Sequence, residues 1–402
     1  MIVWIVNHYA VTPGFPGGTR HYELARELAE VGHEIIVFAA GFNFSTFTET
    51  QQYGTRHWEK EVIGKVDWYW IRTIPYKRND WRRFVNMISF AKRSGKLARQ
   101  LNKPDLIIGS TVHPFTPLYM SRFAQKQNIP FVFEIRDLWP QTLIDNGSWS
   151  KAHPLARFFD KIERKTVYRS SGIVALSPKT PGYLLKKYHF AADKILVLPN
   201  GTNTSKPVVN KITTNENIPL KLMYLGGIDK VHRLDDLMKA IHSLGELQNR
   251  VVVELVGSGK EVQNLKNLAN RYNLENITWS KAIPKSKVAE KLMEADVLFL
   301  STGEVFYGSE NKLAEYLNAA KPILTYTPAT HNDPVEKTGC GLSAAFGDVD
   351  DLALKIKMFS ETDAETRLQM GRKGHRYAAE NLSWHKLAGE LEIFLEKLLY
   401  DS

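Results

Sequence analysis

Short apolar runs alternate with amphipathic stretches along the whole chain of 402 residues. After the first apolar run, Leu24, Leu28 and Val31 recur at helical spacing, and Gly32 then ends the pattern. In the first half, runs of strand length lie at residues 1–6, 34–39, 105–109, 130–135 and 172–176. Apolar strands that alternate with helices are typical of parallel sheets that helices cover.

The same alternation starts again after a polar segment at residues 199–219, which contains Pro and Gly and which we interpret as a linker. A helix is expected near residues 234–244, and apolar runs lie at residues 221–224, 251–256, 297–301 and 322–325. The pattern predicts an α/β fold with two Rossmann-like doubly wound domains. Because such sheets bind ligands at the carboxyl ends of their strands, two domains that face each other would form one cleft.

Composition places limits on the class of protein. Hydrophobic residues make up 43% of the chain, which is enough for two cores. The single cysteine, Cys340, excludes a disulfide framework and a cysteine-based metal cluster, and it fits a reducing compartment. Residues 1–6 read as a strand and not as a signal peptide, and no apolar run approaches the roughly 18 residues of a membrane span. We therefore expect a cytoplasmic protein.

Positive charge is concentrated in the first half. Residues 1–200 contain 28 Lys and Arg against 16 Asp and Glu, a net charge of +12, whereas residues 201–402 contain 25 against 27, a net charge of −2. A basic half indicates an anionic partner, which can be a nucleic acid, an acidic membrane or a phosphate-bearing substrate.

Two candidate sites follow strands of the first half. Gly17 and Gly18 precede a helix, where glycines let a ligand approach the backbone and the helix N-terminus favours an anion; a simple tight turn is the alternative. Their spacing does not match a nicotinamide-dinucleotide fingerprint. Arg136 and Asp137 end another strand and can hold a phosphate or a sugar hydroxyl, unless they form a purely structural ion pair. His113 lies at a comparable strand end.

Two more candidate sites lie in the second half. Gly226 and Gly227 follow a strand, and backbone amides together with Lys230 and Arg233 can cradle a diphosphate; a solvated basic loop is the alternative. Lys312 and Glu315 share one face of a predicted helix, where the cation can reach a phosphate and the carboxylate can accept both ribose hydroxyls. An ordinary surface ion pair is the alternative for that helix.

Several segments resemble those of the family 4 retaining glycosyltransferases, which have the GT-B fold, and in particular the bacterial capsule and O-antigen branch. The resemblance spans nearly the full length. It is carried by Gly17-Gly18 with the LARELA and GHE that follow, FEIRDLWPQTL at residues 133–143, PNG at 199–201, KLAEYLNAAKP at 312–322 and GDVDDL at 347–352.

The resemblance implies an acceptor-binding, membrane-facing domain at residues 1–200 and a nucleotide-sugar domain at residues 201–380, with a C-terminal helix at 381–402 that packs back toward the first domain. A UDP-sugar is the expected donor. The donor-binding residues would be Gly17, Gly18, Gly226, Gly227, Lys230, Arg233, Gly257, Asn311, Lys312, Leu313 and Glu315.

The reaction implied is a hexosyl or N-acetylhexosaminyl transfer that retains anomeric configuration by front-face attack. His113, Arg136 and Asp137 would line the sugar and acceptor side, and together with Lys230 they form the expected catalytic set. The acceptor implied is a saccharide on a polyprenyl diphosphate. No metal or other cofactor is expected, because the chain lacks a suitably placed Asp-x-Asp pair and cations and amides would meet the charge of the leaving group.

The chain departs from the family pattern at several positions. Gly227 and His232 stand where many members carry Arg and Lys, and Lys230 and Arg233 are expected to compensate. Tyr307 replaces a second Glu, for which Glu304 or Glu310 would have to substitute. Arg136 and Asn203 also replace the usual His and Asp.

Residues 76–101 combine eight cations with one acidic residue, Asp80, and interleaved apolar side chains. This composition predicts a basic amphipathic helix that binds an anionic membrane surface, with a solvated helix packed on the core as the alternative. The cations expected at the inner membrane face are Arg82, Arg83, Lys92 and Arg93.

Other functions remain open at this stage. A nucleic-acid partner is not expected, because no recognition motif accompanies the charge. A sugar-nucleotide epimerase of the same fold, or a non-catalytic membrane-associated partner of a polysaccharide assembly complex, are the alternatives to a transferase. The sequence makes no prediction of the oligomeric state.

Overall fold

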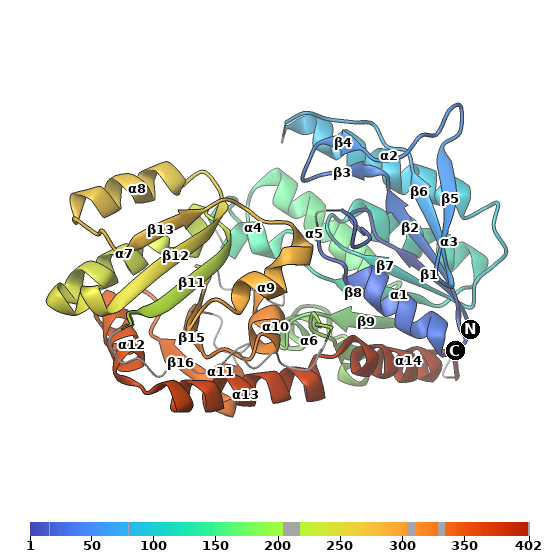
Figure 1. Ribbon diagram of the computed structural model, residues 1–402. Helices are drawn as coiled ribbons and strands as arrows, with labels where there is room; N and C mark the ends of the chain where they lie inside the picture. The colour runs from blue at the N-terminus through green and yellow to red at the C-terminus, as the bar shows by residue number, and fades with distance from the viewer. Residues whose placement is uncertain are drawn as a thin grey trace. The chain divides into compact units, whose positions relative to one another are not determined.

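The computed structural model describes residues 1–15, 17–78, 80–145, 147–203, 218–303, 311–328 and 334–400. The described chain divides into two compact units (Figure 1). Unit 1 comprises residues 1–200 and the C-terminal helix α14 (Trp384–Tyr400), and unit 2 comprises the described residues from 201 to 383. The centre of the expected linker, residues 204–217, lies outside the described residues, as do Glu304, Tyr307 and Glu310.

Unit 1 is built on an eight-stranded sheet whose strands all pair in parallel except the outermost pair, β5 and β6. In spatial order the strands are β10 (Ile195–Val197), β9 (Gly172–Ala175), β8 (Phe131–Ile135), β7 (Leu106–Ser110), β1 (Ile2–Val6), β2 (Glu34–Ala40), β6 (Val66–Ile71) and β5 (Trp58–Ile63). A separate small hairpin pairs β3 (Phe42–Asn43) with β4 (Thr48–Glu49).

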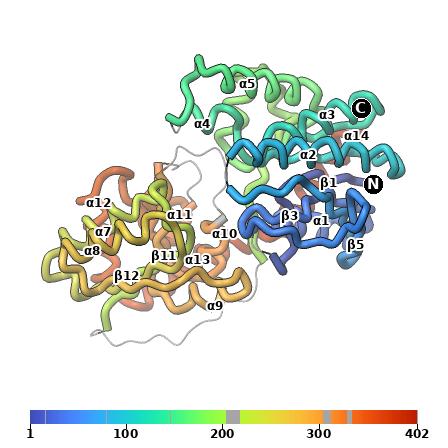
Figure 2. The backbone as a smooth tube through the Cα atoms, turned by 90° about the horizontal axis from the view of Figure 1, so that it is seen from above, coloured from blue at the N-terminus to red at the C-terminus, as the bar shows by residue number. Residues whose placement is uncertain are grey.

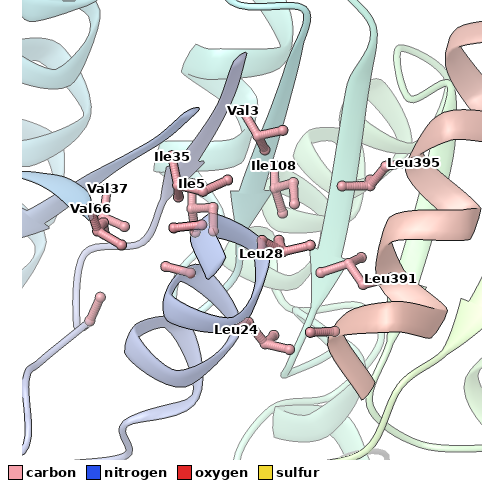
Figure 3. Close-up of a cluster of buried hydrophobic side chains, with 14 of the residues drawn as sticks. Val3, Ile5, Leu24, Leu28, Ile35, Val37, Val66, Ile108, Leu391 and Leu395 are labelled. Atoms are coloured by element: carbon pink, nitrogen blue, oxygen red, sulfur yellow. The ribbon is translucent and has the colours of Figure 1, made fainter. Parts of the chain in front are cut away.

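Helices cover both faces of this sheet. Successive residues of each strand point to opposite faces, and because both sets are apolar, both faces must be buried. Val3 and Ile5 of β1 face α1 (Arg20–Glu30) and α14, whose leucines meet them in Figure 3. Trp4 and Val6 of the same strand belong to the core on the other face. That face is covered by α2 (Trp81–Leu97), α3 (Phe115–Gln127), α5 (Pro154–Val167) and α6 (Thr180–Tyr188), and the short α4 (Gln141–Asp145) follows β8.

Unit 2 is built on six parallel strands. Their spatial order is β13 (Ile277–Ser280), β12 (Val251–Ser258), β11 (Leu220–Gly227), β14 (Val297–Ser301), β15 (Ile323–Tyr326) and β16 (Gly341–Ala344). One face packs on α7 (Leu234–Ser243), α8 (Val262–Arg271) and α12 (Val349–Glu361), and the other on α9 (Val288–Leu292), α10 (Asn311–Asn318), α11 (Pro334–Thr338) and α13 (Ala364–Asn381).

The order of strands indicates the ligand side of each sheet by topology alone. In unit 1, β1 lies between β2 and β7, and in unit 2, β11 lies between β12 and β14. After β1 the chain adds β2 on one side of that strand and later adds β7 on the other, and the strands around β11 are added in the same way. The carboxyl ends of β1 and β11 are therefore the switch points where doubly wound sheets bind ligands. Within the part of the chain that the structure describes, no helix has both the length and the apolar character of a membrane span.

Candidate functional site

The predicted glycines of unit 2 lie at the carboxyl end of β11, at its switch point. Gly226 has φ +152°, and a Cβ there would come within 2.4 Å of the Lys312 side chain. Gly257 is the partner of Gly226 on β12, has φ +156°, and would place a Cβ 1.8 Å from the Gly226 carbonyl oxygen. Because both backbones have positive φ and leave no room for a Cβ, only glycine fits at these positions. The backbone next to the Lys312 side chain is therefore not covered by side chains of residues 226 and 257.

Lys312, in the first turn of α10, is held by a residue to which the sequence assigned no role. Its Nζ donates a hydrogen bond of 2.8 Å to the hydroxyl of Tyr224 and lies 4.5 Å from the centre of that ring. The same hydroxyl donates to the carbonyl oxygen of Gly227 at 2.5 Å. Tyr224 thus fixes one cation directly above the glycines, 88 positions away along the chain.

His232 ends the short 3₁₀ turn η2 (Lys230–His232) on the same side of the sheet. Burial, together with the neighbouring Lys312 charge, lowers the pKa of His232 to about 4. The imidazole is therefore neutral at pH 7, and its buried Nδ1 has no hydrogen-bond partner among the described residues. The Ser301 hydroxyl at the end of β14 donates to the His232 carbonyl oxygen at 2.6 Å and holds this turn at the switch point.

The other two predicted cations of this loop differ from each other. Lys230 is exposed. Arg233 has φ +46° and pairs through Nη2 with the buried Asp236 carboxylate at 2.5 Å, and its guanidinium lies 5.6 Å from the Phe346 ring centre. The compensating role expected of Arg233 toward a diphosphate therefore competes with an internal ion pair, whereas Lys230 is open to solvent.

Glu315 lies one turn after Lys312 on α10 and forms an ion pair with Lys285, a residue that sequence analysis missed. Lys285 begins the 3₁₀ turn η4 (Lys285–Lys287), and nothing in its local pattern distinguishes it from other surface lysines. Leu313 turns the other way and packs against the core. The side chain of Asn311 lies outside the described residues.

In unit 1, the carboxyl ends of three neighbouring strands gather the remaining candidates. His8 follows β1, His113 follows β7, and Arg136 with Asp137 follows β8. Gly17, with φ +145°, would bring a Cβ to 2.8 Å from Val11, and a Cβ on Gly18 would lie 4.0 Å from Arg136. The glycine loop and the strand that ends in Arg136 are thus neighbours.

His113 forms a buried pair with His8, which the sequence did not single out. Nε2 of His113 and Nδ1 of His8 are 2.8 Å apart, so one imidazole donates to the other. Burial and the nearby Arg83 charge lower the pKa of His113 to about 3, and burial, the His113 neighbour and Arg83 lower the pKa of His8 as well. Both rings are neutral at pH 7 and behave as hydrogen-bonding groups, not as charges.

Asp137 lines a small pocket between the end of β8 and helices α3 and α5, together with Thr111, Trp139 and Glu163. The Thr111 hydroxyl accepts hydrogen bonds from the main-chain amides of Arg136 (2.9 Å) and Asp137 (3.3 Å) and so fixes the strand end. Burial raises the pKa of the Asp137 carboxyl, against the opposing charges of Arg136 and Arg83.

A buried ion cluster beneath this site was also missed by the sequence analysis. Glu134 accepts from Arg20 at 2.8 Å and lies 2.6 Å from Nε2 of His21, and Arg20 also donates to the carbonyl oxygens of Leu198 (3.0 Å) and Pro199 (2.6 Å). Burial alone would raise the pKa of Glu134, but His21 and Arg20 hold it well below its usual range. A lone Arg in a helix carries no sequence signal of such a partner.

The four cations expected at a membrane occupy two kinds of position. Arg82 and Lys92 of α2 are exposed. Arg83 instead turns to Tyr9, whose hydroxyl accepts from its Nε at 3.3 Å, and Arg93 donates to the carbonyl oxygen of Arg72. Among the residues that the structure describes, no group of three or more His, Cys, Asp or Glu is arranged to hold a metal ion.

Comparison with known proteins matches both halves of the chain. The family model described as Glycosyltransferase Family 4 matches residues 17–206, and that described as Glycosyl transferases group 1 matches residues 208–377. An uncharacterized glycosyltransferase of Methanocaldococcus jannaschii is 22% identical over 255 residues, which is 61% of this chain. The match spans 63% of that relative's length.

Solved structures share the fold over the full length. The glycosyltransferase WaaG, involved in lipopolysaccharide biosynthesis, matches with a TM-score of 0.70 at 16% identity and covers 98% of this chain and 99% of its own. HepE of Anabaena, in complex with UDP, matches with a TM-score of 0.69 at 15% identity and covers 99% of this chain and 100% of its own. Two Rossmann-like units, matched by two family models along nearly the whole sequence, place this chain in glycosyltransferase family 4, with the GT-B fold.

Proposed function

We propose that the chain transfers a sugar, with retention of configuration, from a UDP-sugar to a lipid-linked saccharide in the synthesis of a bacterial surface polysaccharide. The observation that carries the donor half of this proposal is the arrangement on α10. Lys312 stands over the bare backbone of Gly226, and Glu315 follows one turn later on the same helix. A cation beside backbone amides can bind a diphosphate, and a carboxylate can accept hydrogen bonds from both ribose hydroxyls.

UDP is proposed as the nucleotide because the structure of HepE, which shares the fold, contains UDP. We propose that Lys312 and Lys230 meet the charge of the departing diphosphate and that no metal ion is required. The neutral His232 then leaves Lys312 as the charged group next to the glycines. Transfer that continues unchanged in excess EDTA supports this part of the proposal, and loss of transfer that Mg²⁺ or Mn²⁺ restores overturns it.

For the acceptor half, we propose that His113, Arg136 and Asp137 bind the transferred sugar and the acceptor. The rings of His8 and His113 supply neutral hydrogen-bonding groups, and Arg136 supplies a charge next to Gly18. The excess positive charge of residues 1–200 supports an acceptor that carries a diphosphate and resides at an anionic inner membrane face.

The donor site is tested by replacing Glu315 with Ala and measuring UDP binding by calorimetry. We expect at least about a tenfold loss of affinity, because charge-assisted hydrogen bonds contribute roughly 1.5–3 kcal/mol each. The matched control is Glu290→Ala, which removes an exposed glutamate of α9 that pairs with Lys287. An unchanged affinity in Glu315→Ala, or an equal loss in the control, removes Glu315 from the donor site.

The reaction is tested with a panel of labelled UDP- and GDP-sugars and membrane lipid extracts. Free nucleotide together with a labelled lipid product supports the proposed transfer. An isomerised donor identifies an epimerase instead, and tight binding without turnover identifies a non-catalytic partner.

A further inference from the structure

Helix α5 presents a basic and apolar face to solvent. Its exposed cations are Arg157, Lys161, Arg164 and Lys165, and no ion pair between described residues involves any of them. The two acidic residues of α5 are both paired, Glu163 in the core and Asp160 at a half-buried position. Asp160 pairs with Lys187 of α6 at 2.7 Å, and Glu163 accepts from the hydroxyls of Tyr183 and Tyr188 at 2.9 and 2.7 Å.

Large apolar side chains stand among these cations. Leu155 is 46% exposed, Phe158 is 50% exposed, and Tyr168, just after the helix, is also exposed. We call the exposed residues Leu155, Arg157, Phe158, Lys161, Arg164, Lys165 and Tyr168 the α5 face. Cations interleaved with half-exposed Leu, Phe and Tyr are the composition of helices that lie in the interface of a bilayer.

The neighbouring helices extend this surface. Helix α3 packs against both α2 and α5 and lies between them in the view of Figure 2. The three helices meet at a triangle of rings, Phe84 of α2, Phe115 of α3 and Phe159 of α5, whose centres are 5.9 to 6.5 Å apart.

Each helix carries an exposed aromatic residue close to its member of the triangle. Trp81 precedes Phe84 by three positions and is 67% exposed, Tyr119 follows Phe115 by four positions, and Phe158 adjoins Phe159. Because residues three or four apart share a helix face, Trp81 and Tyr119 project near the corners of the triangle. The exposed Arg82, Arg122 and Lys126 add positive charge on α2 and α3.

We propose that the α5 face, together with Trp81 and Tyr119, is the surface by which unit 1 binds an anionic lipid bilayer. The inference rests on the proposed lipid-linked acceptor, and it moves the centre of membrane contact from α2 to α5. Arg83 and Arg93 of α2 are turned into the protein, whereas all four cations of α5 are free to meet lipid phosphates. Charge alone also fits a nucleic acid, but the half-exposed Leu155 and Phe158 favour insertion among acyl chains.

We test the proposal by co-sedimentation of the full-length protein with phosphatidylcholine vesicles that contain about 30% phosphatidylglycerol. Removing two charges as Lys161→Gln/Arg164→Gln should weaken partitioning roughly 25-fold, since each cation contributes on the order of fivefold. Phe158→Ser should weaken it roughly tenfold through lost apolar insertion. Both sites are exposed, so the variants retain the fold.

Matched controls carry the same chemical changes elsewhere on unit 1. Arg56→Gln/Lys65→Gln removes two exposed charges at the β5–β6 edge, and Ile393→Ser removes a residue of α14 that is 70% exposed. Both controls should partition like the native protein. Equal binding by native protein and the α5 variants, equal losses in the controls, or binding to pure phosphatidylcholine that matches binding to anionic vesicles overturns the proposal.

Other occupants of the α5 face are separated by two further measurements. If light scattering shows a dimer that Phe158→Ser dissociates, the face binds a second copy of the chain, and if anionic vesicles fail to displace a labelled RNA from it, the face binds nucleic acid. Either result overturns the bilayer proposal. UDP binding is measured in parallel, so a failure of vesicle binding with intact UDP binding refutes the surface, whereas a failure of UDP binding refutes the proposed function.

Discussion

At the scale of single residues, the partners that tune the candidate sites come from distant parts of the sequence. Tyr224 is 0% exposed and lies in the same core as Leu220 and Leu222 of β11, yet its hydroxyl accepts a hydrogen bond from Lys312 and orients it. His8 and His113, 105 positions apart, are joined by a hydrogen bond between two buried rings. Such residues look like ordinary core positions in the sequence, because only their polar tips differ from the apolar surroundings.

The buried histidines predict a loss of stability in mild acid. The unfolded His113 has a pKa near 6.5, whereas the folded one has a pKa of about 3, so between these values the unfolded state binds the additional proton. Stability is therefore present above pH 6.5 and falls as the pH drops, by about 2 kcal/mol for this residue at pH 5. The pKa of His8 is also lowered in the folded state, so His8 contributes to the same loss of stability.

Between pH 7 and pH 5, we expect the free energy of unfolding to fall by about 2 kcal/mol less in His113→Gln than in the native protein. Urea unfolding at the two pH values measures this difference. His385→Gln, at a side chain that is 85% exposed, should follow the native protein. If His113→Gln and the native protein lose the same stability, His113 is not neutral and buried in the folded state.

At the scale of elements, the donor-side candidates depend on how closely two strands approach each other. β11 and β12 pair up to their last residues, Gly227 and Ser258. Near this end the Gly257 backbone comes so close to the Gly226 carbonyl oxygen that a Cβ on residue 257 would clash with it. The close approach is possible because Gly226 faces Gly257. The pair therefore determines both the end of the sheet and the bare backbone under Lys312.

Gly257→Ala should destabilise unit 2 by about 3 kcal/mol. It should also weaken UDP binding, because a part of the protein would be unfolded or would have a distorted β11–β12 end. The reason is a Cβ at 1.8 Å from the Gly226 carbonyl oxygen on a backbone with positive φ. Gly389→Ala is the matched control, since nothing lies within 4 Å of its Cβ in the middle of α14, and it should stabilise by roughly 0.5–1 kcal/mol. Equal unfolding midpoints for the two variants would contradict the close approach of β11 and β12.

At the scale of the whole molecule, the chain passes through unit 2 and ends in unit 1. The leucines of α14 lie in the same core as β1, β2 and α1. His33 and Glu392 tie the turn after α1 to this helix at 2.7 Å. The last helix therefore completes a core whose other residues lie in the first half of the sequence.

Leu391→Ala should cost unit 1 about 3 kcal/mol, because it leaves a cavity beneath the sheet, while Ile393→Ala at an exposed position of the same helix should cost little. Hydrogen exchange reports the stability of each unit by itself. Protection should fall in the amides of β1 and β2 and be retained in those of β11 and β12. An equal fall in both sheets would show that the two units unfold as one.

Periodicity alone was sufficient for much of the fold. Strands β1, β2, β7, β8 and β9 of the first sheet and β11, β12, β14 and β15 of the second are mainly apolar runs, because a parallel sheet buried on both faces has few polar positions. Buried Glu134 on β8 and buried Glu254 on β12 interrupt two of these runs. The antiparallel edge formed by β5 and β6 was not predicted, since no residue of the edge strand β5 is buried and its centre, Glu59-Lys60-Glu61, gives no apolar pattern. Glycines and polar residues after apolar runs also predicted where strands end, and Gly226, His113 and Arg136 lie at the carboxyl ends of β11, β7 and β8, because backbone requirements are local.

The tertiary structure decided which of the candidates are available to a ligand. Arg233 and Lys312, in two different segments, were both expected to bind the donor, but Arg233 pairs with Asp236 while Lys312 bonds the Tyr224 hydroxyl over Gly226. Arg83 and the exposed Lys161 likewise differ only in what surrounds them. By itself the sequence determined the elements, the fold and the family, because these follow from periodicity and short motifs. Only the folded chain determined the partners of charges such as Lys312 and Glu315, because Tyr224 and Lys285 are distant from them in the sequence and come close only in the packed structure.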